Sequence, residues 1–123
     1  VRAMTRPLNL LVLYVTDLDA ALRFYTICGL AFRPEQHGSG PLHYSASTAG
    51  PLILELYPTG NGTPTRTRLG FDVDDAAAVA ADLHAAGYVN VSEPRDLDYG
   101  RVRVARDPDG NAVELVEARV LAN

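Results

Sequence analysis

The chain lacks several features that would narrow its function at once. Its 123 residues contain one cysteine, Cys28, and no lysine, so an intrachain disulfide is excluded and all eleven basic residues are arginine. A lone cysteine is typical of a reducing compartment, and we expect Cys28, beside Gly29 at the end of a helix, to be packed rather than reactive. Together with the abundance of alanine, the arginine-only composition indicates a GC-rich genome rather than a function.

Two further absences limit the partners. No apolar run approaches the ~20 residues needed to span a membrane, and the N-terminal VRAMTRP has no apolar signal core. We therefore expect a cytoplasmic protein that does not bind membranes. The net charge of −4 argues against nucleic acid, which needs a basic face. With 47% hydrophobic and 21% charged residues, the composition is that of an ordinary soluble domain.

The most informative feature that is present is an internal repeat. Residues 13–30, LYVTDLDAALRFYTICGL, align with residues 71–88, FDVDDAAAVAADLHAAGY, and residues 51–56, PLILEL, align with residues 110–115, GNAVEL. Each copy predicts a strand, a helix and three further strands, the last of which carries one glutamate, Glu55 or Glu114. If the copies pack about a pseudo-two-fold axis, these two glutamates converge on one site.

Capping and stop signals divide the first copy into elements. Thr16-Asp17 offers a helix N-cap and Gly29 ends that helix. The apolar runs predict strands at 8–15, 30–33, 42–47 and 52–57, the helix following the first of them.

The second copy restarts after a linker rich in Gly, Pro and Thr. Asp74-Asp75 caps an alanine-rich helix that Gly87 ends, and Asp107-Pro108-Asp109-Gly110 is a tight turn. Strands are expected at 68–73, 89–92, 100–106 and 112–117, with an irregular stretch at 93–98. We predict an α+β fold in which residues 1–123 form a single domain. It has two tandem βαβββ modules, at about 7–57 and 67–118 with a linker at 58–66, and its sheets are curved and mostly antiparallel.

Alternation along the strands places both glutamates on predicted cavity faces, because residues two apart share a face. The four sets are Leu10, Val12 and Tyr14; Ile53, Glu55 and Tyr57; Arg68, Gly70 and Asp72; and Ala112, Glu114 and Val116. An unpaired carboxylate within an apolar strand is costly. The alternative is that these faces are simply solvated, as on many antiparallel sheets. A glutamate within an otherwise apolar strand recurs at the same position in both copies, and this recurrence favours a functional site over a solvated face.

Several segments carry a family resemblance. They are Val15-Thr16-Asp17-Leu18, Arg23-Phe24-Tyr25, Gly29-Leu30, Phe71-Asp72-Val73-Asp74-Asp75, Tyr99-Gly100-Arg101, and Asp107-Pro108-Asp109-Gly110-Asn111 with Glu114. The chain resembles the vicinal oxygen chelate superfamily, which includes glyoxalase I, extradiol dioxygenases, fosfomycin-resistance proteins and bleomycin-binding proteins. The resemblance covers essentially the whole chain and implies the fold, whereas that fold hosts many activities.

Metal-dependent members of the family place one ligand on each of four strands. By resemblance, those positions are Leu10, Glu55, Arg68 and Glu114. Leucine has no donor atom and a guanidinium cannot bind a cation, so two carboxylates remain without the usual nitrogen ligands.

The three histidines do not complete this set. His37 is expected in a loop and His84 on the second helix. His43, on the third predicted strand, could reach the cavity, but one histidine cannot fill both vacancies. We therefore expect no metal and no cofactor.

Arg68 also has a positive interpretation. In the implied fold its guanidinium lies between Glu55 and Glu114, where a divalent ion would otherwise sit, and its fork suits carboxylates. The alternative is that Arg68 extends into solvent. Tyr14 and Tyr57 lie on the predicted face, and Tyr44 and Tyr99 flank its mouth, although each tyrosine alone is also compatible with core packing. The residues expected to bind a ligand are Leu10, Val12, Tyr14, His43, Tyr44, Ile53, Glu55, Tyr57, Arg68, Tyr99 and Glu114.

The sequence thus favours a metal-independent protein that binds a small aromatic or heterocyclic molecule, with no catalytic residue assigned. By resemblance to the bleomycin-resistance branch, it would be a homodimer that sequesters an antibiotic. The alternative is an enzyme, a glyoxalase-type lyase or isomerase or a dioxygenase, with Glu55, Glu114 or His43 as general acid or base. A third interpretation is a regulatory or scaffolding domain. The residues at positions 10 and 68 favour the first, because they remove both expected nitrogen ligands.

Overall fold

The structure, a computed structural model, describes residues 4–118, so residues 1–3 and 119–123 of the expected domain lie outside it. The first module contains β1 (Leu10–Val15), α1 (Leu18–Ile27), β2 (Phe32–Glu35), β3 (His43–Ser47) and β4 (Ile53–Pro58). The second contains β5 (Arg68–Asp72), α2 (Ala76–Ala85), β6 (Arg95–Leu97), β7 (Gly100–Arg106) and β8 (Ala112–Glu117). Neither helix in this part of the chain has the length and apolar character needed to cross a membrane.

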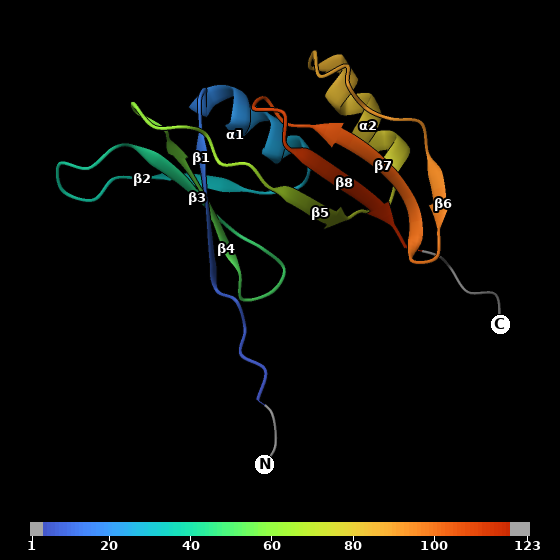
Figure 1. Ribbon diagram of the computed structural model, residues 1–123, viewed down its shortest axis with the longest axis horizontal. Helices are drawn as coiled ribbons and strands as arrows, with labels where there is room; N and C mark the ends of the chain where they lie inside the picture. The colour runs from blue at the N-terminus through green and yellow to red at the C-terminus, as the bar shows by residue number, and fades with distance from the viewer. Residues whose placement is uncertain (1–3, 119–123) are drawn as a thin grey trace.

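Both modules build the same sheet. Their strand orders are β1-β4-β3-β2 and β5-β8-β7-β6. In each sheet the first strand pairs with the last in parallel, and the remaining pairings are antiparallel. Figure 1 shows the two sheets side by side, with α1 and α2 on the same side of the molecule. The predicted α+β fold of two βαβββ modules is confirmed.

The two helices begin and end by the same devices. The Asp17 carboxylate accepts a hydrogen bond from the Ala20 amide at 3.1 Å, and Asp75 accepts one from Ala78 at 3.0 Å. Such N-caps satisfy amides that have no partner inside the helix. Beyond the last turns, Gly29 and Gly87 adopt φ values of 117° and 96°, which strain any other residue. The repeat in the sequence is therefore a repeat of helix boundaries.

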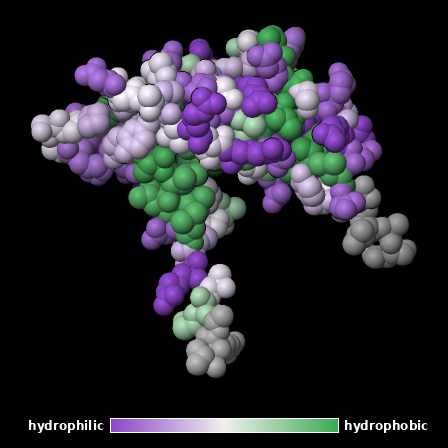
Figure 2. All heavy atoms as spheres, in the orientation of Figure 1, coloured by the Kyte–Doolittle hydropathy of each residue, from purple (hydrophilic) through white to green (hydrophobic). Residues whose placement is uncertain are grey.

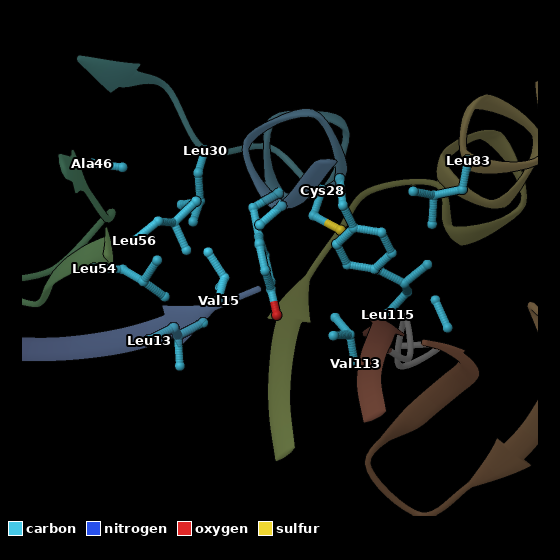
Figure 3. Close-up of a cluster of buried hydrophobic side chains, with 14 of the residues drawn as sticks. Leu13, Val15, Cys28, Leu30, Ala46, Leu54, Leu56, Leu83, Val113 and Leu115 are labelled. Atoms are coloured by element: carbon cyan, nitrogen blue, oxygen red, sulfur yellow. The ribbon is translucent and has the colours of Figure 1, made fainter. Parts of the chain in front are cut away.

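One hydrophobic core joins the two modules. Leu13 of the first module and Leu83 and Leu115 of the second are fully buried in the same cluster (Figure 3). Phe24 of the first module is a fully buried member of this cluster too. The Phe24 ring also packs edge-on against Tyr88 at 5.3 Å between centroids. Because core side chains of both modules contact one another, neither module buries its apolar face alone.

Asp107, in the turn before β8, connects the second module to the first through a hydrogen bond from Tyr25. Its Oδ2 atom accepts from the Tyr25 hydroxyl of α1 at 2.6 Å and from Asn111 Nδ2 at 3.1 Å. Its Oδ1 atom accepts from the Asn111 and Asp109 amides at 2.8 and 3.0 Å. The Asn111 side chain forms hydrogen bonds at the end of the linker. Its Oδ1 atom accepts from the Thr67 amide, and its Nδ2 atom donates to the Thr65 carbonyl. The Asp-Pro-Asp-Gly-Asn motif is thus a structural junction.

The linker lies against the outer edge of β1. The Thr65 amide donates to the Tyr14 carbonyl at 2.8 Å, and the Tyr14 amide donates to the Thr65 hydroxyl at 2.8 Å. Nearer its start, the Thr59 amide donates to the Val15 carbonyl at 3.0 Å. These bonds satisfy part of an otherwise unpaired sheet edge and hold the linker in place.

Two predicted strands were misplaced. β2 continues through Pro34, where the sequence suggested an end. Proline is tolerated there because β2 is the last strand of its sheet, and an edge strand has one side with no neighbouring strand to accept from its amides. The strand expected at 89–92 is instead β6 at Arg95–Leu97, which follows Pro94. Ser92 forms hydrogen bonds with Val104 through both its amide and its hydroxyl, so residues 89–92 approach β7 without joining its ladder.

Cys28 is buried, as expected, with 4% of its surface exposed. Burial, and to a smaller extent the charge of Asp107, raises the pKa of its thiol to about 12. A thiol in this state is a poor nucleophile at neutral pH. Burial and the hydrogen bond to Asp107 likewise raise the pKa of Tyr25.

We expect the free energy of unfolding to fall as pH rises from 9 toward 12. The unfolded chain releases the Cys28 proton near pH 9.0, whereas the folded chain holds it until about pH 12. Each pH unit in that window costs about 1.4 kcal/mol for such a group. Urea unfolding between pH 8 and 11 measures the slope, which should be shallower for Cys28→Ala. Equal slopes would contradict the raised thiol pKa.

Candidate functional site

The face of the first module that points away from the core is open and apolar. On β1, exposed Leu10 and Tyr14 alternate with buried Leu13 and Val15. The register places Leu10 beside Ile53 of β4, Val12 beside Glu55 and Tyr14 beside Tyr57. Exposure of 48% for Leu10, 49% for Tyr14 and 38% for Ile53 means that the described residues, 4–118, do not cover this face. Figure 2 shows hydrophobic side chains gathered over the lower ends of β1 and β4.

A hollow of about 340 Å³ opens on this face, and Leu10, Ile53 and Glu55 form part of its wall. Arg33 and Glu35 of β2 form another part. Apolar, cationic and anionic groups therefore line one depression. Beside it, the Tyr14 and Tyr57 rings lie 6.0 Å apart and tilted by 51°. Burial, and then the charge of Glu55, raises the pKa of the Tyr57 hydroxyl.

His43 of β3 lies on the same face and is almost completely buried, with 1% exposed. Its ring stacks on Tyr57, with centroids 4.0 Å apart and planes within 11°. Its Nδ1 atom lies 3.1 Å from the Pro41 carbonyl, which only accepts, so Nδ1 carries a proton. Its Nε2 atom lies 3.4 Å from Glu35 Oε1 and 4.0 Å from Glu55 Oε2. His43 therefore joins two carboxylates and a phenol in one cluster.

Glu35 and His37 were not among the expected site residues, yet the structure brings them to His43. Glu35 Oε1 lies 4.0 Å from His37 Nε2, and the His37 and His43 ring centroids are 5.1 Å apart. The sequence placed His37 in a loop and Pro34 at the end of a strand, which hid this grouping. Because β2 extends to Glu35, which pairs with His43, the hairpin places Glu35 and His37 beside His43. Two histidines separated by five residues across a predicted hairpin were the sequence feature that could have predicted this cluster.

The second module holds a smaller polar group on its own sheet. The Arg68 guanidinium donates to Glu114 Oε1 at 2.6 Å, and the Tyr99 hydroxyl lies 3.5 Å from the same oxygen. The Arg68 side chain is 66% exposed, whereas that of Glu114 is 19% exposed. An ion pair with one solvated partner contributes about 0–1 kcal/mol to stability.

Two expectations about the site are not met within the single chain that the structure describes. Over residues 4–118, Arg68 forms an ion pair with Glu114 and none with Glu55, which instead faces His43. The glutamates lie on the sheets of two different modules, and those sheets share a core on their other faces. Tyr44 pairs with buried Leu56, so it lies on the opposite face from Glu55, which pairs with Ser45. The other expected residues form two groups, one on each sheet.

The comparisons with known proteins decide the family. The model of the Glyoxalase/Bleomycin resistance protein/Dioxygenase superfamily matches residues 8–115. The chain belongs to this superfamily. Its sheets, helices and duplicated strand order are those of the superfamily fold, as the resemblance in the sequence implied.

Relatives of this superfamily member differ in length. "Putative glyoxylase CFP32" of Mycobacterium tuberculosis is 35% identical over 96 residues, which is 75% of this chain and 36% of that protein. The chain thus spans about a third of that curated relative. "Uncharacterized protein PA2024" of Pseudomonas aeruginosa is 34% identical over 125 residues, covering 91% of this chain and 89% of its own.

Solved structures of the superfamily share the fold. TnmS3, an antibiotic binding protein from Streptomyces sp. CB03234, superposes with a TM-score of 0.75 at 24% identity, over 96% of this chain and all of its own. The oxidase ChaP-H2 gives 0.74 at 24% identity, over 98% of both chains. Lactoylglutathione lyase from Agrobacterium tumefaciens gives 0.65 at 22% identity, over 91% of this chain and 93% of its own. A fold that serves binding, oxidation and lyase chemistry leaves function to the site residues.

Proposed function

We propose that this protein binds a small planar, conjugated molecule on the open face of β1 and β4, without a metal at the four strand positions of the family. The observation that carries the proposal is the exposed face of Leu10, Tyr14 and Ile53 beside the Glu55 carboxylate. Apolar and aromatic walls with a few placed polar groups are the usual makeup of small-molecule sites. Leu10 and Arg68 offer no metal ligand at two of the four family positions. By its name, TnmS3 is an antibiotic-binding protein, which supports an antibiotic-like ligand.

A homodimer would complete this site. In one chain the face with Glu55 and the face with Arg68 and Glu114 are separate and both open to solvent. A second copy that lays its second module over the first module of its partner would enclose the ligand and bring Arg68 to Glu55. We expect a mass of twice 13.2 kDa in light scattering at micromolar concentration. A monomer under those conditions would contradict this assembly.

Binding is testable through tyrosine fluorescence, because the chain has no tryptophan. We expect planar conjugated compounds to quench it saturably in buffer containing a metal chelator. Tyr14→Ala should weaken binding by roughly two- to twelvefold, the worth of one aromatic contact. Tyr44→Ala is the matched control, since Tyr44 lies on the opposite face of the same sheet. Equal affinities for wild type and Tyr14→Ala would place the ligand elsewhere.

The second candidate is a lyase or isomerase that uses the same face. The observation in its favour is His43, held between the Pro41 carbonyl and the carboxylates of Glu35 and Glu55. A positioned imidazole beside a carboxylate is able to move a proton during catalysis. Turnover of a bound compound that is lost in His43→Gln, with binding retained, would select the enzyme over the binding protein.

A further inference from the structure

We propose that Glu35, His37 and His43 form a binding site for a divalent transition metal of the zinc class, at the β2–β3 hairpin. The three ligand atoms, one from each side chain, lie within 4.8 Å of one another. None of these residues occupies the four strand positions at which metal-dependent relatives bind their ion. The site shares Glu35 with the hollow on the open face but uses none of the four family positions, so the proposal that a small molecule binds on that face does not require a metal here.

The hydrogen bonds of His43 prepare it as a ligand. Since Nδ1 carries the proton that faces the Pro41 carbonyl, neutral His43 has its lone pair on Nε2. Metal-binding histidines usually donate their other N–H group to a carbonyl or carboxylate, which fixes the ring and raises its basicity. Tyr57 stacks in parallel on the ring, and its hydroxyl lies at hydrogen-bond distance from Nε2, 3.2 Å away, so a metal ion at Nε2 would take the place of this hydroxyl as its partner.

The carboxylates around Nε2 favour the binding of a cation. Glu35 Oε1 lies only 3.4 Å from it, and Glu55 Oε2 lies 4.0 Å away. Two carboxylates at these distances from one nitrogen lone pair favour a positive ion at that point, where the Tyr57 hydroxyl is otherwise the donor within reach. Arg33 Nε lies 3.9 Å from Glu35 Oε2, so the guanidinium neutralises the other oxygen of Glu35 and leaves Oε1 facing the histidines.

The ligand set and its spacing suit zinc. Two imidazoles and one carboxylate are typical ligands of zinc with bonds of about 2.0–2.1 Å, so ligand atoms sit roughly 3.3 Å apart in a tetrahedron. The pair His43 and Glu35 already has this spacing at 3.4 Å, whereas His37 Nε2 is 4.0 Å from Glu35 Oε1. His37 is 74% exposed and sits in the hairpin loop, so it is free to close the remaining gap.

Three protein ligands leave the fourth position of a tetrahedral ion open. Glu35 also lines the hollow of the open face together with Glu55, so the ion would lie at the wall of that hollow. A metal held there would accept an oxygen or nitrogen atom of an external ligand, and would tie β2 to β3 at the edge of the sheet. The fold thus prepares half of the site, because His43 is buried in place whereas His37 is exposed in the hairpin loop.

The experiment uses the full chain, stripped of metal by a chelator and then titrated with Zn²⁺ in a calorimeter and with Co²⁺ in a spectrophotometer. We expect one ion per chain, a raised melting temperature, and a Co²⁺ spectrum of tetrahedral intensity. His37→Ala should weaken Zn²⁺ binding at least tenfold, because the loss of outer-sphere partners alone costs about 10–100-fold. As His37 is largely exposed, that variant should keep the fold of the wild type.

Two matched variants separate this site from others. His84→Ala removes the histidine of α2, and Glu114→Gln removes a carboxylate of the family position; both should bind Zn²⁺ like wild type. Absence of binding heat in the wild type would overturn the proposal. Loss of binding in Glu114→Gln with full binding in His37→Ala would overturn it in favour of the family position. Ligand quenching in chelator tests the proposed function independently of these outcomes.

Discussion

Asp107→Ala is expected to lower the free energy of unfolding by about 2–6 kcal/mol, because it leaves two buried donors without an acceptor at about 1–3 kcal/mol each. Those donors are the Tyr25 hydroxyl and the Asn111 amide, at 2.6 and 2.8 Å from the carboxylate. The residue is 5% exposed, so water does not readily replace it. The measurement is urea unfolding at pH 7.

Two variants isolate the cause of this loss. Asp109→Ala, in the same turn, removes the carboxylate that accepts an exposed hydrogen bond from the Thr16 amide, and should cost about 1 kcal/mol or less. Tyr25→Phe removes a single donor from Asp107 and should fall between the two. Equal losses for Asp107→Ala and Asp109→Ala would show that the turn, and not the junction between modules, sets the effect.

Phe24→Ala should lower the free energy of unfolding by about 3–5 kcal/mol, the usual cost of deleting a buried phenylalanine. Phe24 is fully buried and contacts Tyr25 and, across the module boundary, Tyr88. Unfolding of both wild type and variant should remain a single transition, because the modules share one core. Coincident curves from circular dichroism and tyrosine fluorescence check this expectation.

The control is Leu22→Ala on the same helix, which is only partly buried and should cost less. Fragments 7–57 and 67–118, expressed separately, should not fold, since each exposes its half of the shared core. Two resolved transitions, or a folded fragment, would show that the chain has two independent domains and would contradict a single domain.

The repeat in the sequence predicted the architecture because it fixes local geometry. Capping aspartates at 17 and 75 and glycines at 29 and 87 set where each helix begins and ends, and these devices act within one turn. Alternation in β1 and β4 likewise predicted that Leu10, Tyr14, Ile53 and Glu55 share one face, since the pleat has a fixed period. The sequence pattern misplaced strands at Pro34, which β2 includes, and at residues 89–92, which lie outside the ladder that β6 forms at Arg95–Leu97. At both points the place of the strand in its sheet, and not the local pattern, set the bounds.

The sequence by itself therefore determined most of the helices and strands, the two modules, and the strand faces that carry charged side chains among apolar ones. Only the tertiary structure decided which of those charged side chains contact one another. It paired Arg68 with Glu114 alone within the described residues, turned Tyr44 to the opposite face, and gathered Glu35, His37 and His43 at one hairpin. Contacts between side chains depend on how strands pair and how the sheets share a core. Such contacts join residues that are far apart in the sequence, so they produce no repeating pattern of apolar and polar residues from which they could be predicted.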